Sequence, residues 1–474
     1  MRSNKKLNPN PNPKPHSILT LSFLILTIVL LVIIILVVSS LTSPRLRLPE
    51  HGSVPALFLK CTVGVDKFLW YAPHSGFSNQ LSELKNALLF AAILNRTLVV
   101  PPVLDHHAVA LGSCSKFRVL SPPDLRLRVW DYVLDLIRHG RYISMADIID
   151  LSSVSTMVRT VDFSYFISLW CGIDLGSVCS DDSDTPSTLS DRLKQCGLHL
   201  SGVNSNSDKC SYAVDVDCRT TVWTYQQNVS DMTLDSYQPD EQLQMKRKIS
   251  FVRHRKDVLK HLGPGSEAHL SSVLAFGSLF TRPYKGSQSY IDIRKSPSDK
   301  RIQPLLNTIE FLPFVPEIKN AGKKFAETKI GTSFLCAQVR LLDGQFKNHW
   351  EATFSGLKQK VDDVKLTNPL PVHVFVMTDL HRSNWNGTYL DVLANDASSF
   401  KVHVLDNEDE IVKLIASKLA ASRGTKLIHC PRNEPDLRLY IEETICSCAS
   451  LGFVRTAGST IAENIELMRK NSFC

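Results

Sequence analysis

One stretch of the sequence decides the fold: residues 68–102 read FLWYAPHSGFSNQLSELKNALLFAAILNRTLVVPP. The apolar run at 68–72 predicts a strand, and leucines at helical spacing predict a helix over 79–95. A second strand is predicted at 97–100, where Pro101 and Pro102 end it. Strand, loop, helix and strand make one parallel unit, and parallel sheets bind ligands beyond the carboxyl ends of their strands.

The second half of the chain shows the same alternation. A helical period over 308–324 leads into a predicted strand at 334–340. Further strands are predicted at 372–379, 401–406 and 453–456, and further helices at 409–422 and 434–451. The stretch 198–250 has turn residues and cysteines but little period, so it is assigned to insertions on the first domain. The predicted fold is therefore α/β, with two Rossmann-like domains that face each other across a cleft.

Composition excludes a disordered chain and gives no case for nucleic acid as a partner. Of 474 residues, 43% are hydrophobic and 21% are charged, which is enough apolar surface to offset the entropy of ordering the chain. The formal net charge is +8, but four uncompensated basic residues lie in the first sixteen. The remaining body is only mildly basic, which suits a pocket for phosphates.

The N-terminal region predicts a membrane anchor. Residues 17–44 carry no charge and are dominated by Leu, Ile and Val, a run long enough to cross a bilayer as one helix. The run is longer than the apolar part of a signal peptide and lacks an A-x-A ending, so an uncleaved signal-anchor is predicted. The basic tail before it places the N-terminus in the cytosol and the body in the lumen of the secretory pathway, a type II layout.

The predicted organisation follows from these features. It comprises a cytosolic tail at 1–16, a transmembrane signal-anchor at 17–43, a stem at 44–60, an N-terminal Rossmann-like domain with a Cys-rich insertion at 61–300, and a C-terminal Rossmann-like domain at 301–474.

Twelve cysteines in a lumenal body predict disulfide bonds, because the compartment is oxidising. Five of them crowd into one Ser- and Asp-rich stretch, at positions 171, 179, 196, 210 and 218, and their connectivity cannot be read from the sequence. Paired C-x-x-C spacings are absent, so no zinc site is predicted. Three N-x-S/T sequons, at Asn95, Asn228 and Asn386, predict a glycoprotein.

Two turns after predicted strands carry groups that could bind an anion. In the first, Gly76 lets the backbone approach a ligand, the helix-start amides point at an anion, and Asn79 offers donors. The alternative is an ordinary turn with Asn79 as helix cap. In the second, the guanidinium of Arg340 could bind two phosphate oxygens, with Asp343 fixing it. The alternative is a surface ion pair between Arg340 and Asp343.

A third turn and one further strand end extend this set. Ser459 and Thr460 open a helix after a predicted strand and could seat an anion, or they could simply cap that helix. Asp379 ends the strand VHVFVMTD and could bind a base or ribose, or only cap the following turn.

The order of these segments resembles the O-fucosyltransferases, above all the protein O-fucosyltransferase branch. GFSNQ at 76–80 and LNRTLVVPP at 94–102 are similar to that family's G-F-G-N-Q loop and L-N-R-T-L-x-V-P-P strand. The resemblance extends to four further segments: 141–147, the family's H-x-R strand at 338–340, its V-F-V-A-T-D strand at 374–379 and its final hydroxyl-rich turn at 458–460. It touches most of the body except about 151–310, and its character is nearest to the plant-type members, which are type II Golgi proteins.

The resemblance implies a reaction and a site. The donor would be GDP-fucose, the two Rossmann-like domains would have the GT-B arrangement, and transfer to a protein or glycan hydroxyl would be inverting, with no cofactor and no obligatory metal. Asn79 would lie near the fucose and diphosphate, Arg340 on the β-phosphate, Asp379 on the nucleotide, and Ser459 and Thr460 on the phosphates. The Golgi is the implied location, with the endoplasmic reticulum as the alternative.

Two positions depart from the family's pattern. The loop residues Gly76, Phe77 and Ser78 would line the donor, but Ser78 stands where the family has a second glycine. Gln338 replaces the family's histidine; it cannot carry a charge, although it can hydrogen-bond the nucleotide.

In the implied mechanism the acceptor hydroxyl attacks C1 of fucose while Arg340 and helix amides stabilise the departing GDP. Asp343 and Glu83 are candidates for a general base, although Glu83 more simply complements the helix dipole. A metal-dependent alternative would use one of the D-x-D triplets at 182–184 and 215–217.

Two non-enzymatic alternatives remain open at this stage. Because Gln338 interrupts the motif, the protein could keep the cleft and only bind a nucleotide sugar or a partner. The acidic runs at 181–184 and 406–410 suggest a calcium-dependent regulator, but neither has the glycine and terminal glutamate of an EF-hand loop. The acceptor and the oligomeric state cannot be read from the sequence.

Overall fold

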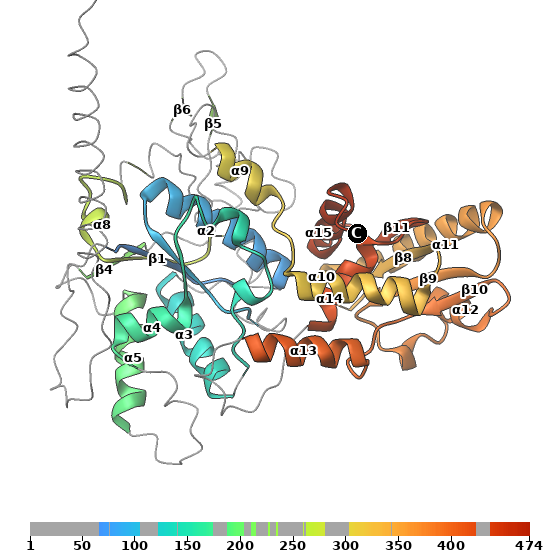
Figure 1. Cartoon of the computed structure of the whole chain (residues 1–474), viewed down its shortest axis with the longest axis horizontal. Helices are drawn as coiled ribbons and strands as arrows, with labels where there is room; N and C mark the ends of the chain where they lie inside the picture. Colours follow the sequence, from blue (N-terminus) through green and yellow to red (C-terminus); the bar gives the residue numbers. More distant parts are fainter. Residues whose placement is uncertain are drawn as a thin grey trace, which may run out of the picture. The chain divides into compact units, whose positions relative to one another are not determined.

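Two parallel β-sheets flanked by helices dominate the fold (Figure 1). The computed structural model describes residues 66–74, 76–104, 122–139, 141–173, 187–202, 210–214, 226–227, 234–235, 259, 262–279, 303–342, 344–422 and 437–474. All of these residues belong to one compact unit, 59–474.

The first sheet has five parallel strands in the order β3-β2-β1-β7-β4. They are β1 (Phe68–Tyr71), β2 (Thr97–Val100), β3 (Thr160–Asp162), β4 (Ser211–Val214) and β7 (Val273–Phe276). Successive side chains alternate between faces: Tyr71 packs with α2 (Phe77–Leu94) and α9 (Gln303–Glu310), whereas Trp70 packs with α3 (Pro122–Arg138), α4 (Phe163–Cys171) and α5 (Ser187–Ser201). Both faces of the sheet are therefore covered by helices.

The predicted strand-helix-strand unit at 68–102 is confirmed. Helix α2 begins at Phe77, two residues before the predicted start. It ends where Asn95 adopts a left-handed φ of 50°, the conformation that commonly closes a helix.

The second sheet has four parallel strands in the order β10-β9-β8-β11. They are β8 (Phe334–Val339), β9 (Val372–Thr378), β10 (Phe400–His403) and β11 (Gly452–Arg455). One face packs on α11 (Trp350–Thr367) and α12 (Tyr389–Asn395). The other packs on α10 (Pro316–Phe325), α13 (Glu410–Ser422), α14 (Leu437–Ser447) and α15 (Thr460–Lys470). The single helix predicted at 308–324 is wrong: α9 ends at Glu310 and α10 begins at Pro316, because Pro313 lies between them and cannot continue a helix.

One hydrophobic core reaches from the first sheet to the second. The ring of Phe77, the first residue of α2, lies 4.3 Å from that of Tyr440 in α14 and 6.0 Å from that of Phe314, measured between centroids. Helix α2 also packs against α15. The strands of the first sheet all precede residue 300 and those of the second all follow it. The domain boundary predicted at that position remains a prediction.

Three disulfides connect described residues, as the cysteine content predicts. Cys171–Cys196 joins α4 to α5, Cys336–Cys446 joins β8 to α14, and Cys448–Cys474 ties down the C-terminus. Cys210 is disulfide-bonded as well.

The remaining elements are short. They are β5 (Gln226–Gln227) and β6 (Leu234–Asp235), which pair antiparallel, α8 (Glu267–Leu270), and single turns at Met145–Asp147, Ser152–Val154, Ala326–Ile330, Gly344–His349 and Arg382–Asn384. None of the helices in the described ranges is both long and apolar enough for a membrane span. The predicted tail, anchor and stem at 1–60 lie outside those ranges.

Candidate functional site

The carboxyl ends of three neighbouring strands meet at one edge of the second sheet. Strand β8 lies between β9 and β11, and all three are parallel. Arg340 and Asp379 follow directly after β8 and β9, and Ser459 lies four residues after the end of β11, so the structure brings together three of the segments that the sequence singled out. Ligands of parallel sheets bind at such an edge.

Gln338 holds two of these segments together from inside. Its side chain is buried; its amide nitrogen donates to the hydroxyl of Ser459 (3.2 Å) and its amide oxygen accepts from the backbone amide of Thr456 (3.3 Å). The Thr456 hydroxyl in turn accepts from the backbone amide of Arg340 (2.9 Å). Both ends of the Gln338 amide therefore fix the turn between β11 and α15.

The start of α15 has the features of an anion seat. Gly458 has a φ of 75°, a left-handed conformation that few other residues adopt, and it turns the chain into the helix. Ser459 is the N-cap and its hydroxyl accepts from the amide of Ala462 (3.5 Å). Its side chain is buried, whereas Thr460 is half-buried. The first amides of any helix lack intrahelical partners and carry a partial positive charge.

Arg340 is half-buried at this edge, and its guanidinium lies over the ring of Phe346 at 5.1 Å from the ring centroid. A guanidinium stacked in this way loses fewer conformations when it binds an anion. Asp343, its predicted partner, lies outside the described residues.

Asp379 supports the chain just after Arg340. Its two carboxylate oxygens accept from the backbone amides of Leu341 (2.7 Å) and Leu342 (3.0 Å). The alternative that Asp379 only caps the turn following its own strand is therefore wrong: its carboxylate supports the turn after β8. The carboxylate is nevertheless exposed, so the geometry leaves room for a nucleotide contact.

At the first sheet, the turn before α2 is organised by backbone bonds. Gly76 is the N-cap, and its carbonyl accepts from the amides of Asn79 (2.9 Å) and Gln80 (3.1 Å). Asn79 lies within the first helical turn, so the alternative that it caps the helix is wrong. Asn79 and Ser78 are half-buried. Gln80 is buried and exchanges two hydrogen bonds with the backbone of Leu104, which anchors the turn to the loop after β2.

The predicted role of Phe77 as a ligand contact needs correction. Its ring is buried among Phe314 and Tyr440 and forms part of the core, because an aromatic side chain at this position gains more from packing than from a polar ligand. Its side chain is therefore not available to line the donor.

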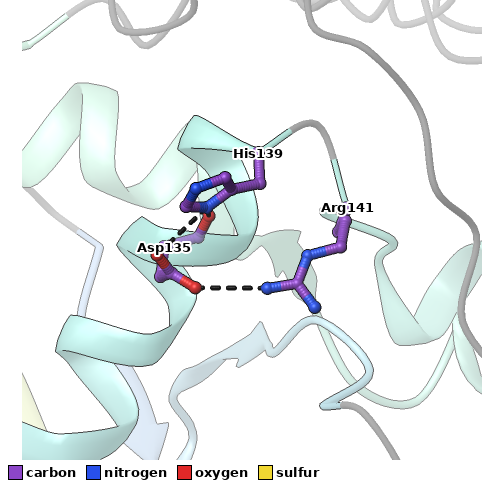
Figure 2. Close-up of polar contacts among 3 residues, drawn as sticks. All are labelled: Asp135, His139 and Arg141. Atoms are coloured by element: carbon purple, nitrogen blue, oxygen red, sulfur yellow. Dashed lines mark hydrogen bonds and ion pairs between the residues drawn. The ribbon is translucent and has the colours of Figure 1, made fainter.

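The segment that resembles the family at 141–147 reaches the same edge of the first sheet. The amide of Met145 donates to the carbonyl of Pro101 at the end of β2 (3.0 Å). Arg141 forms an ion pair with Asp135 of α3 (3.2 Å), which also contacts His139 (3.0 Å), as Figure 2 shows. Such partly exposed pairs contribute about 0–1 kcal/mol, so this one orients Arg141 more than it stabilises the fold.

A buried polar cluster behind the Gly76–Gln80 turn was missed by the sequence reading. His74, Glu83 and Ser278 are 1%, 0% and 0% exposed, and the His74 Nε2 lies 2.7 Å from the Ser278 hydroxyl and 3.4 Å from the Glu83 Oε1. Glu83, for which the sequence suggested only a dipole-complementing role, is fully buried in this cluster. No sequence signal joins it to Ser278, which follows the unpredicted strand β7 almost 200 positions later.

Burial governs the ionisation of this cluster. It raises the pKa of Glu83 well above its ordinary value, and the amides of Leu279 and His74 together with the Ser278 hydroxyl only partly oppose that rise. Burial also raises the pKa of Tyr71, and the nearby Glu83 charge raises it further.

Across the described ranges, no three His, Cys, Asp or Glu side chains gather as metal ligands would. Both D-x-D triplets lie outside those ranges. In the described acidic run at 406–410, the Asp409 carboxylate accepts from the amide of Asp406 (2.7 Å) and Glu408 pairs with Lys413 (2.7 Å). These contacts organise the start of α13.

Comparison with known proteins gives the chain its family. No family profile matches it. It is 57% identical over 426 residues to O-fucosyltransferase 30 of Arabidopsis thaliana, covering 86% of this chain and 83% of that protein. Among solved structures, POFUT1 without ligand aligns over 85% of this chain and 95% of its own at 15% identity (TM-score 0.40). The NodZ fucosyltransferase from Bradyrhizobium aligns over 85% and 92% at 13% identity (TM-score 0.34). On its sequence identity to the Arabidopsis protein, the chain belongs to the O-fucosyltransferase family.

Proposed function

We propose that this protein transfers fucose from GDP-fucose to a hydroxyl of a protein or glycan, with inversion and without an obligatory metal. Family membership supports the reaction class. The main structural support for this site is the hydrogen-bonded edge of the second sheet, where Gln338 and Thr456 hold Arg340 beside the first turn of α15. That edge combines a guanidinium with helix amides, which are the groups that bind a diphosphate.

The chemistry follows from where charge develops. The bond from the acceptor oxygen to C1 of fucose forms while the bond from C1 to the β-phosphate oxygen breaks, and its electron pair leaves with GDP. Arg340 and the α15 amides stabilise that negative charge, and losing one such donor typically lowers kcat by about 10²–10³. Asp343 is the proposed acceptor of the hydroxyl proton.

We place the donor between the two sheets, in a GT-B arrangement. Support comes from the contacts of Phe77, the first residue of α2, with Tyr440 of α14 and of α2 with α15, which bring the helix after β1 against helices of the second sheet. In this proposal Asn79 and the α2 amides act on the fucose side, and Asp379 and Thr460 act on the nucleotide side.

We also propose that the protein is a type II membrane protein with its body in the Golgi lumen. The apolar run at 17–43 and the basic tail before it support the anchor. The three disulfides support an oxidising compartment. Retention in the endoplasmic reticulum would be distinguished by imaging a tagged full-length chain against markers of both organelles.

The test is donor turnover and thermal stability of the full-length protein in detergent. GDP and GDP-fucose should each raise the Tm, because a ligand that binds only the folded form stabilises it. Arg340→Ala should lose turnover, whereas Arg159→Ala should keep it, since Arg159 forms an exposed pair with Asp66 before the amino end of β3. A Tm shift with no turnover on any acceptor would favour a binding protein, a reading that the full engagement of Gln338 within the fold also supports. Absence of both would refute the proposal.

A further inference from the structure

The ends of β1 and β7 leave the first sheet side by side. The two strands are parallel neighbours, with Tyr71 opposite Phe276. The amide of Ala72 donates to the carbonyl of Gly277 (3.1 Å), and the His74 ring contacts the Ser278 hydroxyl (2.7 Å). The loop that leads into the Gly76–Gln80 turn is therefore tied at two points to a loop far away in sequence.

Helix α2 packs against both of these loops. Asn79, Glu83 and Asn86 are spaced by four and three residues, so they lie on one face of the helix. Glu83 lies 3.4 Å from His74, and Asn86 donates to the carbonyl of Leu279 (2.8 Å). Both are fully buried, whereas Asn79, at the outer end of this polar stripe, is half-buried. The stripe thus leads from the candidate site into the core.

This cluster is costly for stability alone. Burying an imidazole and a carboxyl group forfeits their hydration, and apolar side chains of similar volume are commonly as stabilising or more so. The raised pKa of Glu83 reflects that cost. The surrounding β1, β7 and α2 residues are otherwise packed with apolar side chains such as Leu84, Leu274 and Phe276. A polar cluster among these apolar side chains, directly behind the turn, calls for a role beyond filling the core.

We infer that the His74–Glu83–Ser278 cluster fixes the Gly76–Gln80 turn so that Asn79 and the first amides of α2 are held in place against the donor. His74 and Glu83 are then positioning residues, since neither is exposed enough to touch the substrate. This inference rests on the proposed transfer of fucose from GDP-fucose.

The expected effect is on transfer more than on nucleotide binding. In the proposed site the diphosphate is held chiefly by Arg340 and α15, which belong to the second sheet, whereas Asn79 acts on the sugar side. A small displacement of a positioning group, of about 1 Å, can cost about 100-fold in rate. Loosening the turn should therefore lower kcat/KM for GDP-fucose about 10- to 100-fold while the Kd for GDP changes by less than about threefold.

The experiment compares four variants of the full-length protein in detergent. Glu83→Met removes both carboxyl oxygens at similar length, His74→Ala removes the ring, and His74→Gln retains a donor toward Ser278. The control is Lys85→Met on the same helix, whose buried side chain donates instead to the carbonyl of Glu310 (2.9 Å). Turnover of GDP-fucose, the Kd for GDP and the Tm are measured for each.

The inference predicts that Glu83→Met and His74→Ala lose transfer, that His74→Gln retains part of it, and that Lys85→Met keeps it at a comparable loss of Tm. The inference is overturned if the cluster variants fold and transfer fucose like the parent, or if they lose no more transfer than Lys85→Met does. In that case the proposed function still stands. A parent without turnover and without a Tm shift with GDP would instead overturn the proposed function, and this inference with it. Should Glu83→Met not fold, the His74→Gln and His74→Ala pair decides the question.

Discussion

The fully buried carboxyl of Glu443 gives a prediction whose size follows from the structure. Glu443 lies in α14, where Asn464 of α15 donates to its Oε2 (2.5 Å) and its Oε1 has no hydrogen-bond partner among the described residues. Burial raises its pKa from 4.5 to about 8; the Asn464 bond opposes this rise and the neighbouring Glu442 charge adds to it. The carboxyl is therefore protonated in the folded protein at neutral pH, although it ionises in the unfolded chain.

The sign and magnitude follow from proton linkage. A folded pKa above the unfolded one means that the folded state binds the extra proton, so this group lowers the free energy of unfolding as pH rises from 4.5 toward 8. Each pH unit costs about 1.4 kcal/mol, which gives about 3 kcal/mol at pH 7 and about 5 kcal/mol above pH 8. Glu443→Gln cannot ionise and keeps an oxygen for Asn464, so it should remove this cost.

The assay is thermal unfolding of parent and variant between pH 4.5 and 8.5. With an unfolding entropy of about 2 cal/mol/K per residue over roughly 400 residues, a 3 kcal/mol gain corresponds to about 4 °C. Glu443→Gln should match the parent at pH 4.5 and exceed its Tm by about 4 °C at pH 7. The matched control is Glu466→Gln, an exposed carboxyl of α15 paired with Arg455, which should change the Tm little. A difference between Glu443→Gln and the parent that does not grow with pH would refute the reasoning.

Three further changes test the site and the fold. Asn79→Asp should reduce donor turnover at least about 100-fold, because it places a negative charge in the proposed donor-binding site. The Tm should stay the same or rise, because an acidic side chain in the first turn of a helix is stabilising. Unchanged turnover would contradict this prediction. Gln338→Leu removes the donor to the Ser459 hydroxyl and the side-chain acceptor of the Thr456 amide, although that amide keeps its bond to the backbone carbonyl of residue 338 (3.0 Å). The change should lower the free energy of unfolding by about 0.5–1.5 kcal/mol in denaturant unfolding and weaken GDP binding; equal stability would count against the network. Replacing Cys336 and Cys446 by Ser removes a disulfide that spans 110 residues and should lower the free energy of unfolding by about 5 kcal/mol. Removing the Cys448–Cys474 disulfide, which spans 26 residues, should lower it by about 3.5 kcal/mol. The reverse order in denaturant unfolding would show that loop entropy does not dominate.

Local pattern was sufficient for much of the fold. The strand-helix-strand unit at 68–102 follows from leucine spacing and flanking turn residues, and the structure places its helix within two residues of the prediction. The split between α9 and α10 was missed, although Pro313 and Pro316 were visible, because the apolar period continues across the break. Periodicity describes a face, whereas a proline decides whether the backbone can continue.

The candidate site, too, could be predicted only in part from the sequence. Strand ends mark Arg340, Asp379 and Ser459, and parallel topology then brings them to one edge. The burial of Glu83 could not be predicted, because a charged residue on an early helical turn is normally solvated and its cover comes from β7 and Ser278. Phe77 was misread for a related reason: its packing against Tyr440 depends on a contact across more than 360 positions of sequence.

The central claim, that Arg340 holds the pyrophosphate of the donor, is tested most directly by calorimetric titration of the full-length protein with GDP and with guanosine. The parent and Arg159→Ala should bind GDP at least about 100-fold more tightly than guanosine, since charge-assisted phosphate contacts contribute about 1.5–3 kcal/mol each. Arg340→Ala should bind GDP about 10- to 100-fold more weakly than the parent and should bind guanosine with the same affinity as the parent. Equal GDP affinity in Arg340→Ala and the parent would contradict the account.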